Sequence, residues 1–277
     1  MPRNFAVVTD STADLPGAWR HQYGIEVVPL KVLFGQETFR DRVDITDEEF
    51  FKRLAASSTL PTTSAPSPGE FAEVYQRLAK DYESCISIHI GAQLSATGEA
   101  ARVGASSVDG FKVNIIDSQT VSMPIAFLCR VAAECSTLDE ATAEVLQRVP
   151  KTRVLALLDT LRYLEMGGRL SRAQAVIGTM LDLKPLLLVA PPDKEIKAVD
   201  RVRTRSRAIP RMVEYFKSDL PVEHMAVMHA QAPEEAERVA AELRSQFPGR
   251  EVTVGQIGAV LGTHTGPKAM GIVYVKS

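Results

Sequence analysis

The first half of the sequence alternates short runs of β-branched residues with longer segments of helical period. Candidate strands lie at 5–9, 25–33, 85–89 and 112–116, and candidate helices at 68–80, 96–106, 124–135 and 138–149. Polar residues, such as Asp10 and Asp117, follow these candidate strands directly. The alternation predicts a parallel sheet covered by helices, with polar groups for ligand binding at the carboxyl ends of the strands.

The second half has a different pattern, which begins near residue 152. Strands are expected at 153–157, 185–190, 195–199, 224–229, 251–257 and 271–275, and helices at 160–166, 206–217 and 233–246. The turn at 191–194 (PPDK) predicts a hairpin. Because 277 residues are enough for two cores, we expect two α/β domains, 1–152 and 153–277, the second built on a mixed sheet.

The composition excludes several classes of protein. Lysine and arginine total 32 against 34 acidic residues, so no basic field for nucleic acid is expected. Cys85, Cys129 and Cys135 form no C-x-x-C pair, which favours buried thiols in a reducing cytoplasm. No window of about 18 apolar residues predicts a transmembrane segment, and any membrane contact would be transient.

Hydroxyl-bearing residues crowd the segment 62–68 (TTSAPSP), which is expected to be a long loop. Ser67, with Pro68 next and Glu70 three positions later, predicts a capping box at the start of a helix. Thr63 lies too far upstream to cap that helix. It therefore remains a candidate ligand.

Two further segments combine glycine with hydroxyl residues. Ser95, in 91–98 (GAQLSATG), is placed to cap the next helix, where free amides also favour a bound carboxylate or phosphate. His264 lies in 262–267 (GTHTGP), where the lack of an apolar period predicts a tight loop close to a ligand, with Thr265 beside it. A neutral His264 can accept a hydroxyl proton, and a protonated one can pair with a carboxylate.

The arginines allow two interpretations. Gly167 and Gly168 are expected to end a helix, while Arg169 and Arg172 are either solvated charges or a fork for phosphate or for acids of another protein. The arginines at alternate positions from 201 to 207 would share one side of an extended segment, and a solvated face is the default interpretation for them.

The sequence lacks a signature for catalysis of its own. No Walker-type loop, G-x-G-x-x-G or G-x-S-x-G is present, and the five histidines and three cysteines lack metal-ligand spacing. We therefore expect no metal and no cofactor.

Several segments in order resemble the DegV family, whose members include the fatty-acid-binding subunits of bacterial fatty acid kinase. The resemblance runs nearly end to end and comprises 8–16 (VTDSTADLP), 63–67 (TSAPS), 94–97 (LSAT), 117–118 (DS), 161–171 (LRYLEMGGRLS), 184–185 (KP), 203–205 (RTR) and 262–267 (GTHTGP). Ala65 stands where the family usually has glutamine, and Ala96 where it usually has glycine. These departures bear on the preferred chain length and unsaturation more than on the carboxylate site.

The resemblance implies a DegV-like two-domain fold: an α/β/α parallel-sheet N-terminal domain and a smaller two-layer mixed-sheet C-terminal domain, like the dihydroxyacetone kinase substrate domain. It implies that Thr63, Ser95 and His264 bind a fatty-acid carboxylate, and that Arg169 and Arg203, with Thr265, support the site or face a partner. The apolar run 173–188 would line the lipid tunnel, although its residues also suit a core.

The expected function is that of a non-catalytic lipid-binding subunit in phospholipid metabolism. It would present the carboxylate of a long-chain fatty acid to a separate ATP-binding kinase subunit for phosphorylation to acyl phosphate. Two alternatives remain: an acyl-ester hydrolase or acyltransferase using Ser95 and His264, and a binder of another small carboxylate or carbonyl compound.

Overall fold

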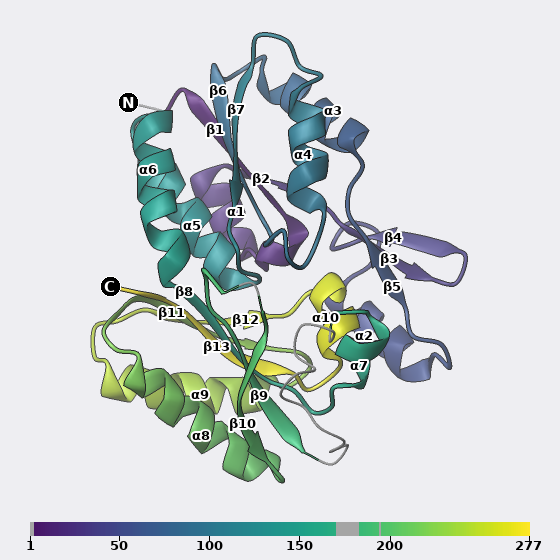
Figure 1. The fold of residues 1–277 in the computed structure, drawn as a ribbon, viewed down its shortest axis with the longest axis vertical. Helices are drawn as coiled ribbons and strands as arrows, with labels where there is room; N and C mark the ends of the chain where they lie inside the picture. The colour runs from purple at the N-terminus through teal and green to yellow at the C-terminus, as the bar shows by residue number, and fades with distance from the viewer. Residues whose placement is uncertain (1–2, 170–182, 194) are drawn as a thin grey trace.

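A four-stranded parallel sheet forms the centre of the N-terminal part of the chain (Figure 1). The computed structural model describes residues 3–169, 183–193 and 195–277. The strands run in the order β2-β1-β6-β7. Their bounds are β1 (Phe5–Asp10), β2 (Ile25–Val28), β6 (Ser84–His89) and β7 (Lys112–Asp117).

Helices cover both faces of this sheet, as the sequence pattern predicts. On β1, Ala6 and Val8 pack with α3 (Pro68–Leu78) and α4 (Thr97–Ala105), and the odd-numbered Phe5 and Val7 pack on the opposite face. That opposite face is covered by α5 (Met123–Glu134) and α6 (Leu138–Arg148), with α1 (Gly17–Tyr23) beside α5. Burial on both faces explains why β1 is apolar without alternation.

The C-terminal part forms a six-stranded mixed sheet in the order β10-β9-β8-β13-β11-β12. Only the β11–β12 pair is parallel among its described strands. The strands are β8 (Thr152–Leu157), β9 (Lys184–Val189), β10 (Lys197–Val202), β11 (Val222–His229), β12 (Val252–Gln256) and β13 (Met270–Lys276). The fold class is thus the mixed α/β architecture expected from the sequence.

The two faces of this second sheet have different neighbours. One face carries α8 (Arg205–Ser218) and α9 (Pro233–Gln246), and the other faces the N-terminal part (Figure 1). Alternate strand residues divide between the faces: Leu155 and Ile272 pack toward the helices, whereas Val154 and Val273 belong to the core shared with the N-terminal part. The division into two domains near residue 152 stays a prediction.

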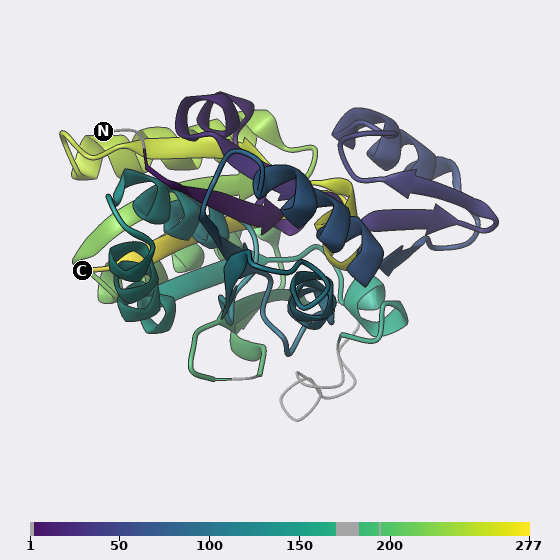
Figure 2. The same ribbon diagram turned by 90° about the horizontal axis from the view of Figure 1, so that it is seen from above.

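A third unit stands at one side of the molecule in both Figure 1 and Figure 2. It consists of the antiparallel sheet β4-β3-β5 and the helix α2 (Asp47–Ala56). Its strands are β3 (Lys31–Phe34), β4 (Glu37–Arg40) and β5 (Thr62–Ser64). The sequence analysis predicted neither α2 nor β4.

Two predictions in this region are wrong. The single strand expected at 25–33 is split between two sheets, because the chain leaves the parallel sheet at Val28 and enters the small one at Lys31, on either side of Pro29. Proline lacks the amide donor that a strand in the middle of a sheet needs, so Pro29 favours the break between β2 and β3. The second wrong prediction concerns the segment expected as a long loop, which contains β5, whose Thr63 pairs with Val32 of β3.

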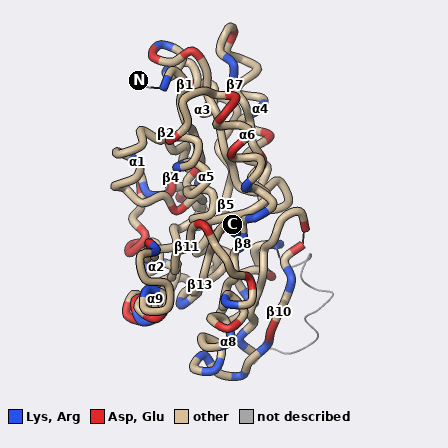
Figure 3. Tube along the Cα trace, turned by 90° about the vertical axis from the view of Figure 1, so that its left-hand side faces the viewer, with Lys and Arg blue, Asp and Glu red and all other residues tan. Residues whose placement is uncertain are grey.

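The segment from 201 to 207 is not extended throughout, because the strand β10 ends at Val202 and the helix α8 begins at Arg205, so its arginines do not share one side. Arg201, Arg203 and Arg207 are exposed, in agreement with the default interpretation of a solvated face for most of these arginines. Basic and acidic residues are interspersed along the elements in view in Figure 3.

In the ranges that the structure describes, no helix has the length and apolarity needed to cross a bilayer. Arg172 and most of the apolar run 173–188 lie outside those ranges.

The capping box predicted at the start of α3 is present and gives a test of local stability. The Ser67 hydroxyl accepts from the Glu70 amide at 3.3 Å, and Glu70 Oε2 accepts from the Ser67 amide at 2.9 Å. Ser67→Ala should lower the free energy of unfolding by about 1 kcal/mol. Urea denaturation would show this loss. Ser64→Ala is the control, since the Ser64 hydroxyl bonds only its neighbour's carbonyl within the described chain, and equal losses in both variants would contradict the assignment.

Candidate functional site

An apolar cavity lies between the six-stranded sheet and the N-terminal part. Its empty space, including open solvent at the mouth, is about 1010 Å³. Its floor is one face of the sheet, with Val154 and Ala156 from β8, Leu187 and Val189 from β9, and Val273 from β13. Pockets lined mainly by apolar side chains with a few polar groups are typical of small-molecule sites.

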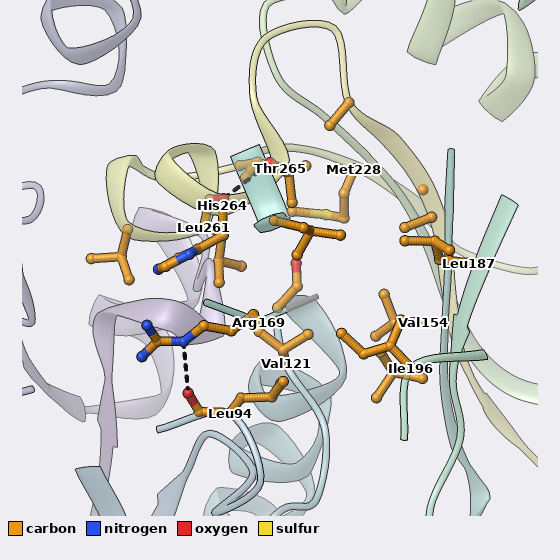
Figure 4. A pocket seen from close by; sticks show the side chains of 18 of the residues that line it. Leu94, Val121, Val154, Arg169, Leu187, Ile196, Met228, Leu261, His264 and Thr265 are labelled. Carbon is orange, nitrogen blue, oxygen red and sulfur yellow. Dashed lines mark hydrogen bonds between the residues drawn. The ribbon is translucent and has the colours of Figure 1, made fainter. Parts of the chain in front are cut away.

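Polar side chains gather at one end of this cavity. In Figure 4, His264 and Arg169 lie on one side, and the apolar Leu187, Val154 and Ile196 lie on the other. Thr63, Ser95 and Thr265 also line the cavity. The structure therefore brings five of the six residues selected from the sequence around one space. The sixth, Arg203, is exposed and is not among the residues lining the cavity.

The polar end is joined by a hydrogen bond between Thr63 and His264. Thr63 Oγ1 lies 2.8 Å from His264 Nε2, across 201 positions of sequence. Thr63 is presented by β5 of the small sheet, and His264 by the helix α10 (Ala259–Thr265). The tight loop predicted at 262–267 is therefore wrong, because His264 lies on a helical turn that ends only at Gly266.

His264 is uncharged at neutral pH. Burial, and to a smaller extent the nearby positive charge of Arg169, lower the pKa of His264 to about 4. Among the described residues, His264 Nδ1 has no hydrogen-bond partner, so the single ring proton is better placed on Nε2. In that tautomer Nε2–H donates to Thr63 Oγ1, which leaves the Thr63 hydroxyl proton free for another acceptor.

Gly167 holds the other side of the imidazole ring. A Cβ at this position would overlap His264 Nδ1 and stand 3.0 Å from the Tyr163 carbonyl oxygen. The helix α7 (Arg162–Met166) does end at Gly167, as predicted, and Gly168 has the positive φ of +69°. Helix termination alone misses the second role of Gly167, which is to let the backbone approach the histidine.

Ser95 does not cap α4, contrary to the first of its two interpretations. The residue at the helix start is Ala96, which has no side chain that can cap, and Ser95 Oγ instead lies 2.8 Å from the hydroxyl of the buried Thr97. The Ser95 hydroxyl therefore takes part in a hydroxyl pair at the wall of the cavity. Its second interpretation, as an anion ligand, stays a prediction.

Arg169 is held in place by two backbone carbonyls. Its Nε donates to Leu94 O at 3.3 Å, shown as a dashed line in Figure 4, and its Nη1 donates to Gly167 O at 2.8 Å. The guanidinium thus joins α7 to the loop before α4 and places a positive charge beside the cavity. Thr265 lines the cavity with its hydroxyl bonded to Leu261 O at 3.0 Å.

The sequence analysis missed Ser122 as a residue of the cavity wall. It precedes α5, has a φ of +65°, and donates from its hydroxyl to the buried Asp14 at 2.7 Å. Its position just before Met123 and Pro124 signals a helix start, but nothing in that pattern places it opposite α10.

The fold and the cavity define a class of protein: two packed α/β units that enclose an apolar space closed at one end by hydroxyl and imidazole groups. The model of the DegV family of uncharacterised proteins matches residues 4–277. Protein DegV of Bacillus subtilis is 38% identical over 280 residues, covering 98% of this chain and 99% of that protein. The chain therefore belongs to the DegV family.

Solved structures of the family have the same fold. The crystal structure of DegV from Bacillus subtilis, described as a fatty acid binding protein, superposes with a TM-score of 0.90 at 36% identity, covering 99% of this chain and all of that one. A DegV family protein from Thermus thermophilus, described for its fatty acid binding, gives a TM-score of 0.90 at 30% identity with the same coverage. Both superpositions therefore cover nearly the whole chain.

The protonation state of His264 can be tested by titration. Because an unfolded histidine takes up its proton near pH 6.5 and His264 only near 4, this residue makes the free energy of unfolding fall as the pH falls from about 6.5 toward 4. Ring ¹⁵N shifts of His264 should stay those of a neutral imidazole between pH 8 and pH 5. Titration near pH 6.5 in the folded protein would contradict this assignment, and the urea-unfolded protein supplies the reference.

Gly167→Ala should displace the imidazole of His264 and break its bond to Thr63. The backbone φ of −77° is compatible with alanine, so the effect arises from the overlap, at a cost of about 1–3 kcal/mol in the free energy of unfolding. A shifted His264 ring resonance and a lowered thermal midpoint would show it. In the control Gly17→Ala the new Cβ meets open space, and wild-type behaviour of Gly167→Ala in both measurements would refute the packing role.

Proposed function

We propose that this protein binds a long-chain fatty acid, with the tail in the apolar cavity and the carboxylate at Thr63, Ser95 and His264. One observation carries the proposal: the cavity has an apolar floor and ends at the hydrogen-bonded pair of Thr63 and His264. The fatty acid binding described for the Bacillus subtilis and Thermus thermophilus relatives supports the same ligand class.

The apolar cavity favours a long chain over a small carboxylate. A saturated sixteen-carbon acid brings about 14 methylenes, and at about 0.8 kcal/mol each their transfer from water contributes on the order of 11 kcal/mol. Association and ordering of the chain oppose binding by several kcal/mol. The remainder is enough for tight binding without a charge pair, whereas a small carbonyl compound would leave the apolar floor at Leu187 and Val273 uncovered.

The polar end suits a carboxylate that must stay reactive. Thr63, whose hydroxyl proton is released by the bond from His264, donates to one carboxylate oxygen, and Ser95 donates as well. The Arg169 charge stabilises the anion from nearby while its Nε and Nη1 remain bonded to carbonyls. Neutral donors hold a carboxylate while withdrawing less charge from its oxygens than a direct arginine clamp would.

We further propose that the bound carboxylate is presented to a separate ATP-binding kinase subunit, in the service of phospholipid metabolism. A carboxylate oxygen would attack the terminal phosphorus of ATP, with ADP as the leaving group and an acyl phosphate as the product. Arg203, which is exposed, and Arg169 at the cavity are the side chains assigned to support this encounter. The chain carries no nucleotide-binding motif, so the phosphoryl donor has to come from the partner.

The hydrolase alternative is not supported by the hydrogen bonds of the site. A nucleophilic serine needs its base within hydrogen-bond reach. In the described parts of the chain, His264 Nε2 bonds Thr63 and Ser95 bonds Thr97, so no Ser95–His264 pair is formed.

Native mass spectrometry of the protein purified from a bacterial host should show a bound fatty acid.

Thr63→Ala and Ser95→Ala should each weaken fatty acid binding about 10–100-fold, because each removes one hydrogen bond to a charged acceptor, at about 1.5–3 kcal/mol. Isothermal titration of delipidated protein measures this change. Ser64→Ala, next to Thr63 on the same strand but exposed, should bind as the wild type does.

The same variants test the kinase step. With a purified kinase subunit and ATP, both should form acyl phosphate more slowly at limiting fatty acid, while the Ser64→Ala control keeps the full rate. Delipidated wild-type protein that takes up no fatty acid would refute the proposal, and a variant with wild-type affinity would refute the role of that residue.

A further inference from the structure

Three residues of the N-terminal part converge on the start of α10. The Gly258 amide donates to Asp14 Oδ1 at 2.9 Å, and the Ala259 amide donates to Asp41 Oδ1 at 3.2 Å. Arg42 donates from Nη2 to the Gln256 carbonyl at 2.8 Å, and the same nitrogen lies 3.2 Å from Asp14 Oδ1. Two carboxylates and one guanidinium thus hold the backbone that leads into the helix carrying His264.

The helix has no side chain of its own to do this. Its N-cap is Gly258, which makes no capping bond, and its seven residues are too few to be stable in isolation. Gly258 also admits the close approach of Arg42, whose guanidinium carbon lies 3.3 Å from where a Cβ would stand. The position of α10 is therefore set by residues distant in sequence.

Other parts of the chain also pack against this helix. α10 contacts α7, α2, β3, β5 and the short 3₁₀ helix η1 (Ser11–Ala13). A Cβ at Gly262 would stand 2.7 Å from the rings of both Phe50 and Phe51 of α2. Asp47, at the start of α2, bonds Arg42 as well. One segment, 41–51, thus both caps α10 and packs against it.

Asp14 also connects α10 to the cavity wall. Its Oδ2 accepts from the hydroxyl of Ser122, which lines the cavity, while its Oδ1 accepts from the Gly258 amide and lies close to Arg42.

The two carboxyls differ from exposed ones in their pKa. Asp14 is fully buried, and burial raises its pKa to about 7 while Arg42 opposes the rise. Burial likewise raises the pKa of Asp41 to about 6. Both carboxyls are therefore more than half ionised at pH 8.

We infer that Asp14 and Asp41, together with Arg42, are positioning residues of the carboxylate site: they hold α10 so that His264 meets Thr63. The identity of the ligand in this inference rests on the proposed function, whereas the positioning of His264 does not. A shift of α10 by about 1 Å would stretch the Thr63–His264 contact from 2.8 Å beyond the range of a hydrogen bond. The Thr63 hydroxyl would then lose its donor, and Thr265, one residue further along, would move away from the cavity as well.

The test compares a carboxylate ligand with a neutral one of the same length, at pH 8. In Asp14→Ala and Asp41→Ala, which remove the oxygens that accept the Gly258 and Ala259 amides, the affinity for hexadecanoate should fall at least 10-fold, while the affinity for hexadecanol, which fills the same apolar cavity, should change less than twofold. Asp44→Ala is the matched control, since Asp44 lies in the same segment, is exposed and bonds Arg40. It should leave both affinities within twofold of the wild type.

A second readout needs no ligand. In the ligand-free wild type, the Nε2–H proton of His264 should be protected and visible by NMR because it is bonded to Thr63, and it should be lost or shifted in Asp14→Ala and Asp41→Ala. An unchanged His264 signal, or equal losses of affinity for hexadecanoate and hexadecanol, would overturn the inference. Should Asp14→Ala fail to fold, Asp41→Ala decides the question, because it removes a single acceptor, the one that takes the Ala259 amide. Wild-type protein that binds no fatty acid would refute the proposed function, while the His264 signal would still decide the positioning role.

Discussion

The site depends on one hydrogen bond, between the hydroxyl of Thr63 and the imidazole of His264. It joins a strand of the small sheet to a helix near the end of the chain, and both residues line the cavity. The bond also sets which group donates and which accepts. Because His264 is buried and neutral, its imidazole N–H donates to the Thr63 hydroxyl, and the Thr63 hydroxyl can donate to an acceptor in the cavity.

The cavity lies on one face of the second sheet, whose strand residues point alternately to its two faces. One face of β8, β9 and β13 is covered by α8 and α9, and the other, with Val154, Leu187 and Val273, has to be covered by the N-terminal part. The N-terminal part does not cover this face completely. Some of the apolar side chains of this face therefore line the cavity. The same residues are therefore suited both to stabilise the packing of the two parts and to receive an alkyl chain.

Local patterns predicted the sheets and most helices well. The helix α9 has the bounds expected from its sequence, and the capping box at Ser67 is present. Errors arose where distant contacts decide the structure. Residues 62–64 look like a loop, and they form a strand by pairing with β3, a partner that a local pattern does not reveal. The segment around His264 looks like a loop because of its glycines, and the contacts of Asp14 and Asp41 with the backbone at the start of its helix come from residues distant in sequence. The resemblance selected Thr63, Ser95 and His264, whose role as ligands stays a prediction. The Thr63–His264 pair, the contact of Gly167 with the ring and the place of Ser122 in the cavity wall needed the three-dimensional structure.

A crystal structure of the protein with hexadecanoate bound would show where the carboxylate and the alkyl chain lie. We expect the carboxylate within hydrogen-bond distance of Thr63 Oγ1 and Ser95 Oγ, with His264 Nε2 still bonded to Thr63 and the chain lying over Val154, Leu187 and Val273. A fatty acid bound in the opposite direction, with its carboxylate away from Thr63, or one bound outside this cavity, would contradict it.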